Sequence, residues 1–239
     1  MFDKKLSDLE LVIFDLDGTL IDSNGMHNEL DVELARMLGE NKTANEILDE
    51  RDHFFKIINS TDIYLSYCEY LKQKYCSNLS AEEILKTRRL LSKQFSKEVK
   101  FKPHADEIIK YFKQNNIKLA LGTVSRRADL EVYINENEYI KKKCNLQEAF
   151  DYIITKDDVV LKKPNPEVYN KIIEKFAIKD LTKCIVIEDS LSGVRAAKTA
   201  GLEVIAVYDK YSDKDREKIN ELADYKVYDF EELMKNFEK

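Results

Sequence analysis

Short apolar runs recur along this chain, and each is followed by a segment whose apolar residues have helical spacing. The runs lie at residues 11–14, 118–121, 152–154, 184–187 and 204–207. Alternation of this kind is typical of βαβ units, in which a parallel sheet carries helices on both faces. The pattern therefore predicts an α/β fold with a Rossmann-like parallel sheet.

Residues 23–98 interrupt this alternation. They contain no strand-like run, and their apolar residues recur at helical spacing, as in Ile63, Tyr67 and Leu71. A compact domain rarely contains so long a loop without structure. Ser80 and Glu83 have the spacing of a capping box, which indicates that a helix begins there. We expect an all-helical cap domain at 23–98, inserted into a core domain formed by 1–22 and 99–239.

The insertion is rich in aromatic residues, which are expected to form the core of a helical bundle, with the alternative that one or two of them line a substrate pocket. They are Phe54, Phe55, Tyr64, Tyr67, Tyr70 and Tyr75. Its basic side chains are expected to form a solvated face. They are Lys72, Lys74, Arg88 and Arg89.

Composition narrows the class of protein. The chain has 239 residues, with 39 Lys and Arg against 45 Asp and Glu, which gives a formal net charge of −6. A mildly acidic chain without a dense basic block argues against nucleic acid or an anionic membrane as partner. Residues 1–10 are too polar for a signal peptide, and no apolar run approaches the roughly 20 residues of a membrane span. A cytoplasmic protein, and a monomer, is expected.

The polar residues that follow the apolar runs are the candidates for chemistry, because the carboxyl ends of parallel strands share one edge of the sheet. They are Asp15, Asp17, Thr123, Glu188 and Asp189, and they are joined by Lys163, which precedes the helix expected at Pro166. Clustered carboxylates repel one another and remain ionised in a water-poor cleft only if a cation is present. Oxygen ligands of this kind suit Mg²⁺, and a lysine opposite them completes a site for a phosphoryl group.

Four segments together resemble the motifs of the haloacid dehalogenase (HAD) superfamily, in the same chain order. They are the sequence DLDGTL from Asp15, Thr123, Lys163 followed by PNP, and Glu188 with Asp189. The resemblance is greatest to phosphatases and phosphomutases of the β-phosphoglucomutase type, whose helical cap follows the first strand. It covers the whole chain and implies the HAD fold.

The resemblance also implies a role for each residue. Asp15 would be the nucleophile that forms an aspartyl phosphate, and Asp17 the general acid and base. Thr123 would bind phosphoryl oxygens and Lys163 would neutralise charge. Mg²⁺ would be held by Asp15, the Asp17 backbone carbonyl and Asp189, with Glu188 as a direct or water-mediated ligand. The implied activity is that of an Mg²⁺-dependent phosphomonoester hydrolase, and a mobile cap would close over a small phosphorylated metabolite, with a sugar phosphate favoured.

Several alternatives remain open at this point. A hexose phosphomutase of the β-phosphoglucomutase type and a non-catalytic HAD-fold binding protein are the rival functions. The cap lacks the Gly-x-Ser-Arg loop with which the mutases grip their substrate, which favours a phosphatase. Glu188 has a structural alternative to metal binding: residues 188–190 could simply begin a helix, with Ser190 as its N-cap. Ser125 is expected to cap the helix that follows it. His27 is either a residue near the general acid or a structural histidine.

Overall fold

The computed structural model describes residues 2–58, 60 and 62–238. The chain divides into two compact units. The first comprises Met1–Ser23 and Val99–Lys239, and the second comprises Asn24–Glu98.

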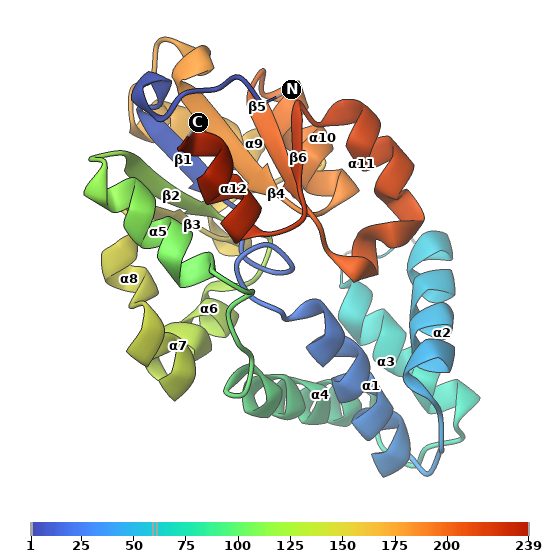
Figure 1. The fold of residues 1–239 in the computed structure, drawn as a ribbon. Coiled ribbons are helices and arrows are strands. Elements are labelled where there is room, and N and C mark those ends of the chain that lie inside the picture. The colour runs from blue at the N-terminus through green and yellow to red at the C-terminus, as the bar shows by residue number, and fades with distance from the viewer. Residues whose placement is uncertain (1, 59, 61, 239) are drawn as a thin grey trace. The chain divides into compact units, whose positions relative to one another are not determined.

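Within the described residues, the first unit contains a six-stranded parallel sheet with the order β3-β2-β1-β4-β5-β6 (Figure 1). The strands are β1 (Leu11–Phe14), β2 (Lys118–Gly122), β3 (Tyr152–Ile154), β4 (Cys184–Glu188), β5 (Glu203–Val207) and β6 (Tyr225–Val227). The predicted α/β class and Rossmann-like sheet are confirmed. The edge strand β6 was not predicted, because its three residues include the exposed Lys226 and form no apolar run.

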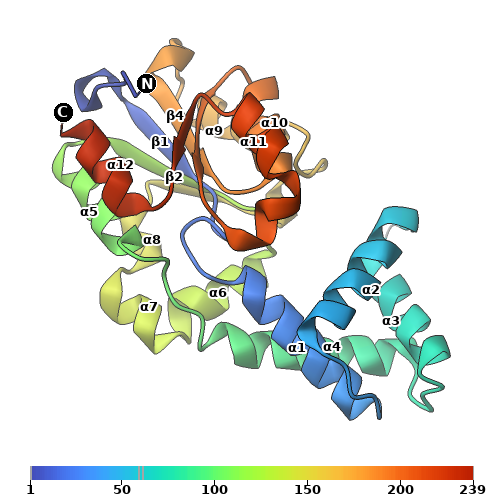
Figure 2. The same cartoon turned by 45° about the vertical axis from the view of Figure 1, so that its right-hand side comes forward.

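Helices cover both faces of this sheet (Figures 1 and 2). One face carries α5 (Ala105–Gln114) and α12 (Phe230–Phe237), and the other carries α9 (Glu167–Lys175), α10 (Leu191–Thr199) and α11 (Arg216–Leu222). In β1, Phe14 packs against the rings of Phe112 and Phe230, whereas Ile13 belongs to the cluster on the opposite face. Burial on both faces explains why the central strands are continuous apolar runs.

Between β2 and β3 the chain forms α6 (Arg127–Asn135), α7 (Glu138–Lys143) and α8 (Leu146–Ala149). Among the described residues, no helix has both the length and the apolar character needed to cross a membrane.

In its described residues, the second unit consists of α1 (Asn24–Met37), α2 (Ala44–Ile57), α3 (Ile63–Lys74) and α4 (Ala81–Ser96). The predicted capping box is present: the Ser80 hydroxyl accepts from the Glu83 amide, and the Glu83 carboxylate accepts from the Ser80 amide. Phe54 and Tyr67 lie in the apolar core of this unit, as predicted, whereas Tyr64 is 41% exposed and lies outside it.

One prediction for this unit is wrong. Arg88 is buried, with 7% of its surface exposed, whereas Lys72, Lys74 and Arg89 are exposed as expected. The Arg88 guanidinium donates to Asp31 at 2.9 Å and lies 4.6 Å from the centre of the Tyr64 ring. Arg88 is buried because it pairs with the buried Asp31 carboxylate of α1, and a buried charge requires a partner.

The segments that lead out of the first unit and back into it pair with each other. Ile21 forms an antiparallel bridge with Phe101. The Asp22 amide donates to the Lys100 carbonyl at 2.9 Å, and the Lys102 amide donates to the Leu20 carbonyl at 2.9 Å. The chain thus leaves and returns through one short two-stranded ribbon.

Candidate active site

The strand register brings the predicted residues to one edge of the sheet. Phe14 of β1 pairs with Ile187 of β4, so Asp15 lies beside Glu188, and the Asp15 amide donates to the Ile187 carbonyl at 3.0 Å. Strand order reverses at β1, and open α/β sheets bind their ligands at such a point.

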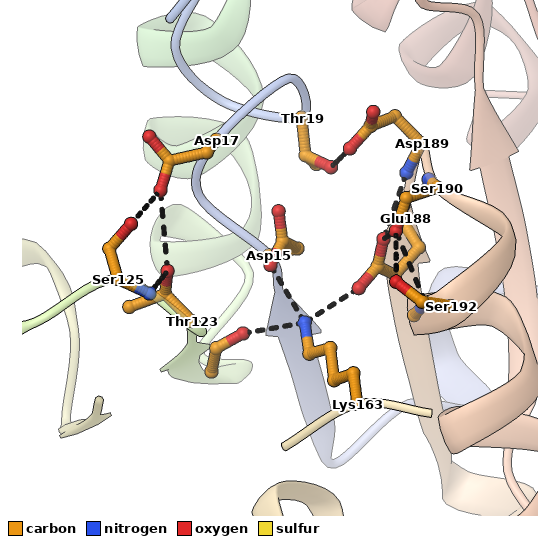
Figure 3. A network of polar contacts seen from close by, with 12 residues as sticks. Asp15, Asp17, Thr19, Thr123, Ser125, Lys163, Glu188, Asp189, Ser190 and Ser192 are labelled. Carbon is orange, nitrogen blue, oxygen red and sulfur yellow. Dashed lines mark hydrogen bonds and ion pairs between the residues drawn. The ribbon is translucent and has the colours of Figure 1, made fainter. Parts of the chain in front are cut away.

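Lys163 precedes α9 and reaches into the centre of this edge (Figure 3). Its ammonium donates to Asp15 Oδ1 at 2.7 Å, to the Gly122 carbonyl at 2.9 Å and to Glu188 Oε1 at 2.6 Å. An ammonium group has three N–H donors, and each has an acceptor here. The Lys163 side chain is only 3% exposed, so it is not a solvated surface lysine.

Three buried carboxylates meet here, those of Asp15, Glu188 and Asp189. One oxygen of each lies within 4.8 Å of an oxygen of the other two. Asp189 Oδ1 accepts a hydrogen bond from Thr19 Oγ1 at 2.8 Å, which orients the carboxylate. Three carboxylates facing one lysine leave an excess of negative charge. A hard divalent cation with oxygen ligands fits this donor set.

The electrostatics of the residues themselves lead to the same conclusion. Burial, and then the nearby Glu188, raise the pKa of Asp15 well above its ordinary value. The same two causes raise the pKa of Asp189 to about 7. Burial works against the charge on Lys163, but Asp15 and Glu188 outweigh it and raise the pKa of Lys163, so the ammonium stays charged. A bound divalent cation would favour the ionised form of the acids.

Asp17 lies on the other side of Asp15, and its carboxylate is turned toward hydroxyl groups (Figure 3). It accepts from Ser23 Oγ at 2.6 Å, from Ser125 Oγ at 2.5 Å and from Thr123 Oγ1 at 3.4 Å. Thr123 is therefore in the site, with 1% of its surface exposed. The capping role expected for Ser125 is wrong: the N-cap of α6 is Arg126, and the Ser125 hydroxyl is used to hold Asp17.

Glu188 is fixed by both of its carboxylate oxygens. Oε1 accepts from Lys163 and from the Tyr169 hydroxyl, and Oε2 accepts from Ser190 Oγ and from the amides of Asp189 and Ser190. Ser190 is the N-cap of α10, as expected. Glu188 therefore joins the start of α10 to the lysine.

Gly193 leaves the room that Glu188 occupies. A Cβ atom at Gly193 would lie 1.7 Å from Glu188 Oε1, far inside van der Waals contact. This function of Gly193 is not apparent from the sequence, because the glycine and the acid meet only when α10 folds back along β4.

Thr19 and Tyr169 also belong to the site, although neither is among the residues predicted for it. Thr19 lies within the DLDGTL segment, which was a usable signal. Tyr169 lies on the buried face of α9 with Ile172, three residues later. This helical spacing is typical of core residues and gives no sign that the Tyr169 hydroxyl contacts the site. His27 lies on α1 of the second unit.

The sequence matches a family model and several curated proteins. The model of the haloacid dehalogenase-like hydrolases matches residues 12–207. A phosphorylated carbohydrates phosphatase of Thermotoga maritima is 30% identical over 203 residues, which cover 82% of this chain and 84% of that protein. A bifunctional riboflavin kinase/FMN phosphatase of Arabidopsis thaliana is 32% identical over 205 residues. The match covers 85% of this chain and 49% of that relative, so the chain spans about half of its length.

Solved structures share the fold. A Thermotoga maritima protein provisionally assigned as a beta-phosphoglucomutase has a TM-score of 0.73 at 27% identity, covering 92% of this chain and 94% of that one. CbbY from Rhodobacter sphaeroides in complex with phosphate has a TM-score of 0.71 at 23% identity, covering 97% of this chain and 100% of that one. From the family match, these relatives and the acid-rich sheet edge, the chain belongs to the haloacid dehalogenase-like hydrolases and is a phosphatase.

Proposed function

We propose that the chain is an Mg²⁺-dependent phosphomonoester hydrolase that works through an aspartyl phosphate on Asp15. The observation that carries the proposal is the position of Asp15: it is buried at the end of β1, held by Lys163 at 2.7 Å and grouped with Glu188 and Asp189.

The residues that would hold Mg²⁺ are Asp15 and Asp189 through their carboxylates and Asp17 through its backbone carbonyl. Glu188 accepts five hydrogen bonds from described residues, which favours a water-mediated role over direct ligation. When bound, the ion would orient the phosphoryl group and offset its negative charge.

In the first half-reaction a carboxylate oxygen of Asp15 attacks phosphorus, and the bond from phosphorus to the leaving oxygen breaks. Asp17 gives a proton to that oxygen. Lys163 and the hydroxyl of Thr123 bind the charge on the phosphoryl group. These groups are fixed before the substrate arrives, and such preorganisation supplies much of the catalysis of phosphoryl transfer.

In the second half-reaction water attacks the aspartyl phosphate, and the bond between phosphorus and Asp15 breaks. Asp17 takes the proton from the water, so both acids return to their starting states with release of inorganic phosphate. The hydroxyls of Ser23 and Ser125 hold the Asp17 carboxylate, so Asp17 must exchange these partners for the reacting oxygen when it transfers the proton.

We propose a small phosphorylated metabolite as substrate, with a sugar phosphate favoured. Two relatives support this choice by their names: the phosphorylated carbohydrates phosphatase of Thermotoga maritima and a (DL)-glycerol-3-phosphatase of Arabidopsis thaliana. The structural likeness to a provisional beta-phosphoglucomutase keeps a hexose phosphomutase as the second candidate. The intact set of site residues argues against a non-catalytic binding protein.

A phosphate-release assay tests these proposals. The panel contains sugar phosphates, glycerol 3-phosphate, FMN, phosphoglycolate and pyrophosphate, with Mg²⁺ and with EDTA. We expect free phosphate from one or more sugar phosphates only when Mg²⁺ is present. Rapid acid quenching after mixing with ³²P-labelled substrate should trap labelled protein. An isomerised hexose phosphate without free phosphate would identify a mutase, and no turnover across the panel would favour a binding protein.

A further inference from the structure

Tyr169 is a buried residue of the site that has no role in the reaction proposed above. It lies in the first turn of α9, with none of its surface exposed. Its hydroxyl donates to Glu188 Oε1 at 2.9 Å, and its ring centre lies 5.0 Å from the Lys163 ammonium nitrogen. One side chain thus touches both partners of the central ion pair.

The hydroxyl acts on the oxygen that also binds the lysine. Glu188 Oε1 accepts from Lys163 at 2.6 Å and from Tyr169 at 2.9 Å. The Tyr169 hydroxyl therefore competes with Lys163 for Glu188 Oε1. This competition weakens the attraction between the Glu188 carboxylate and the Lys163 ammonium. Asp15 Oδ1 competes for the same ammonium from 2.7 Å away.

The ring acts separately from the hydroxyl. An aromatic face attracts an ammonium group, and the attraction strengthens where water is excluded. The Lys163 side chain is 3% exposed, so the ring contributes to its environment without competition from solvent. The ring also blocks one direction in which the lysine could move.

We propose that Tyr169 is a positioning residue that sets where the Lys163 ammonium lies between Asp15 and Glu188. It acts through two separable contacts, the hydroxyl on Glu188 and the ring beside the ammonium. The consequence for catalysis rests on the function proposed above for Asp15 and Lys163, whereas the consequence for the lysine position does not.

The test compares Tyr169→Phe, which removes the hydroxyl and keeps the ring, with Tyr169→Leu, which removes both. Tyr152→Phe is the matched control, because the Tyr152 ring lies 5.5 Å from the ammonium of Lys175, also on α9. In the control no charged cluster of the site is touched. Each protein is checked for folding by thermal unfolding.

Two measurements are made on each variant. The first is steady-state hydrolysis of p-nitrophenyl phosphate with Mg²⁺: we expect kcat to fall about tenfold in Tyr169→Phe and about a hundredfold in Tyr169→Leu, with KM nearly unchanged. The second is a crystal structure of each protein, in which the Lys163 nitrogen of Tyr169→Phe should have left hydrogen-bond distance of Asp15 Oδ1. Tyr152→Phe should match the unaltered protein in both.

The outcomes separate the two proposals. Normal kcat in Tyr169→Phe, or a lower kcat with Lys163 still bonded to Asp15, would overturn the positioning role. If the unaltered protein hydrolyses no phosphoester, the proposed function fails, and the crystal structures still decide whether Tyr169 positions Lys163.

Discussion

The two units of the chain each bury a cluster of charged side chains, and the clusters differ in their balance. In the first unit Asp15, Glu188 and Asp189 face one lysine. In the second unit one carboxylate, Asp31, faces two arginines: Arg51 donates to it at 2.8 Å and Arg88 at 2.9 Å.

This difference separates a candidate active site from a structural ion pair. Both oxygens of Asp31 accept hydrogen bonds from arginine, and Arg51 also donates to Asn28 at 2.7 Å. This carboxylate already has two cationic partners, so the cluster offers no place for a metal cation. The cluster around Asp15 has more negative charge than its lysine can neutralise, and the pKa of Asp15 and that of Asp189 are raised as a result of burial and repulsion. An imbalance of this kind indicates a site for a cation.

The largest expected effect comes from Asp15→Asn. Turnover should fall by roughly 10³-fold or more, because the amide cannot form the covalent intermediate. The free energy of unfolding should not decrease, since the change removes one of several carboxylates that repel one another. Phosphate release and urea denaturation measure the two effects. Turnover near the normal rate would remove Asp15 from its proposed role.

An Asp-to-Asn substitution at Asp31 in the second unit should instead destabilise the fold. Asp31→Asn should lower the free energy of unfolding by about 3 kcal/mol, because it leaves the buried Arg88 and the partly buried Arg51 without their carboxylate. Glu33→Gln is the control: Glu33 lies on the same helix, and its partner Arg36 is largely exposed, so this ion pair contributes little to stability. Urea denaturation should show little change for Glu33→Gln. Equal effects of the two substitutions would contradict the structural role of Asp31.

A smaller effect is expected from Gly193→Ala. The new methyl group would occupy the place of Glu188 Oε1, so the carboxylate must leave its partners. We expect activity or Mg²⁺ affinity to fall by about 10- to 100-fold, the usual effect of disturbing residues that orient a metal site. Arg195→Ala, an exposed position on the same helix, serves as the control. Activity is followed across an Mg²⁺ titration, and an unchanged titration would show that Glu188 is not held in this way.

The smallest effect concerns metal binding to the folded protein. Mg²⁺ at ten times its dissociation constant should stabilise the native state by about 1.4 kcal/mol, or roughly 3–6 °C in Tm. Thermal unfolding with Mg²⁺ and with EDTA measures this shift. Asp189→Asn should show a smaller shift or none. A full shift in that variant would place the ion elsewhere.

The core of the fold could be predicted because its strands are buried on both faces. β1 and β4 are unbroken apolar runs, whereas β6 at the edge includes Lys226 and gave no such signal. Residues at the ends of the central strands could likewise be placed at one edge of the sheet. Their partners could not, because Ser125, Tyr169 and Gly193 acquire their functions only through contacts between elements.

The burial of Arg88 likewise could not be predicted from the sequence. Its spacing in α4 permits a solvated face, and its partner Asp31 lies 57 positions earlier in the chain. Nothing in the local sequence distinguishes it from Arg89, which is exposed. Pairing of distant charges has to be seen in three dimensions.

The ribbon formed by the pairing of Ile21 with Phe101 has an implication for engineering and for evolution. Because the inserted segment starts and finishes at adjacent points, a different insert could be grafted there without altering the register of the sheet. The chemistry at the sheet edge could then be retained while the module that precedes Val99 is exchanged for one suited to another substrate.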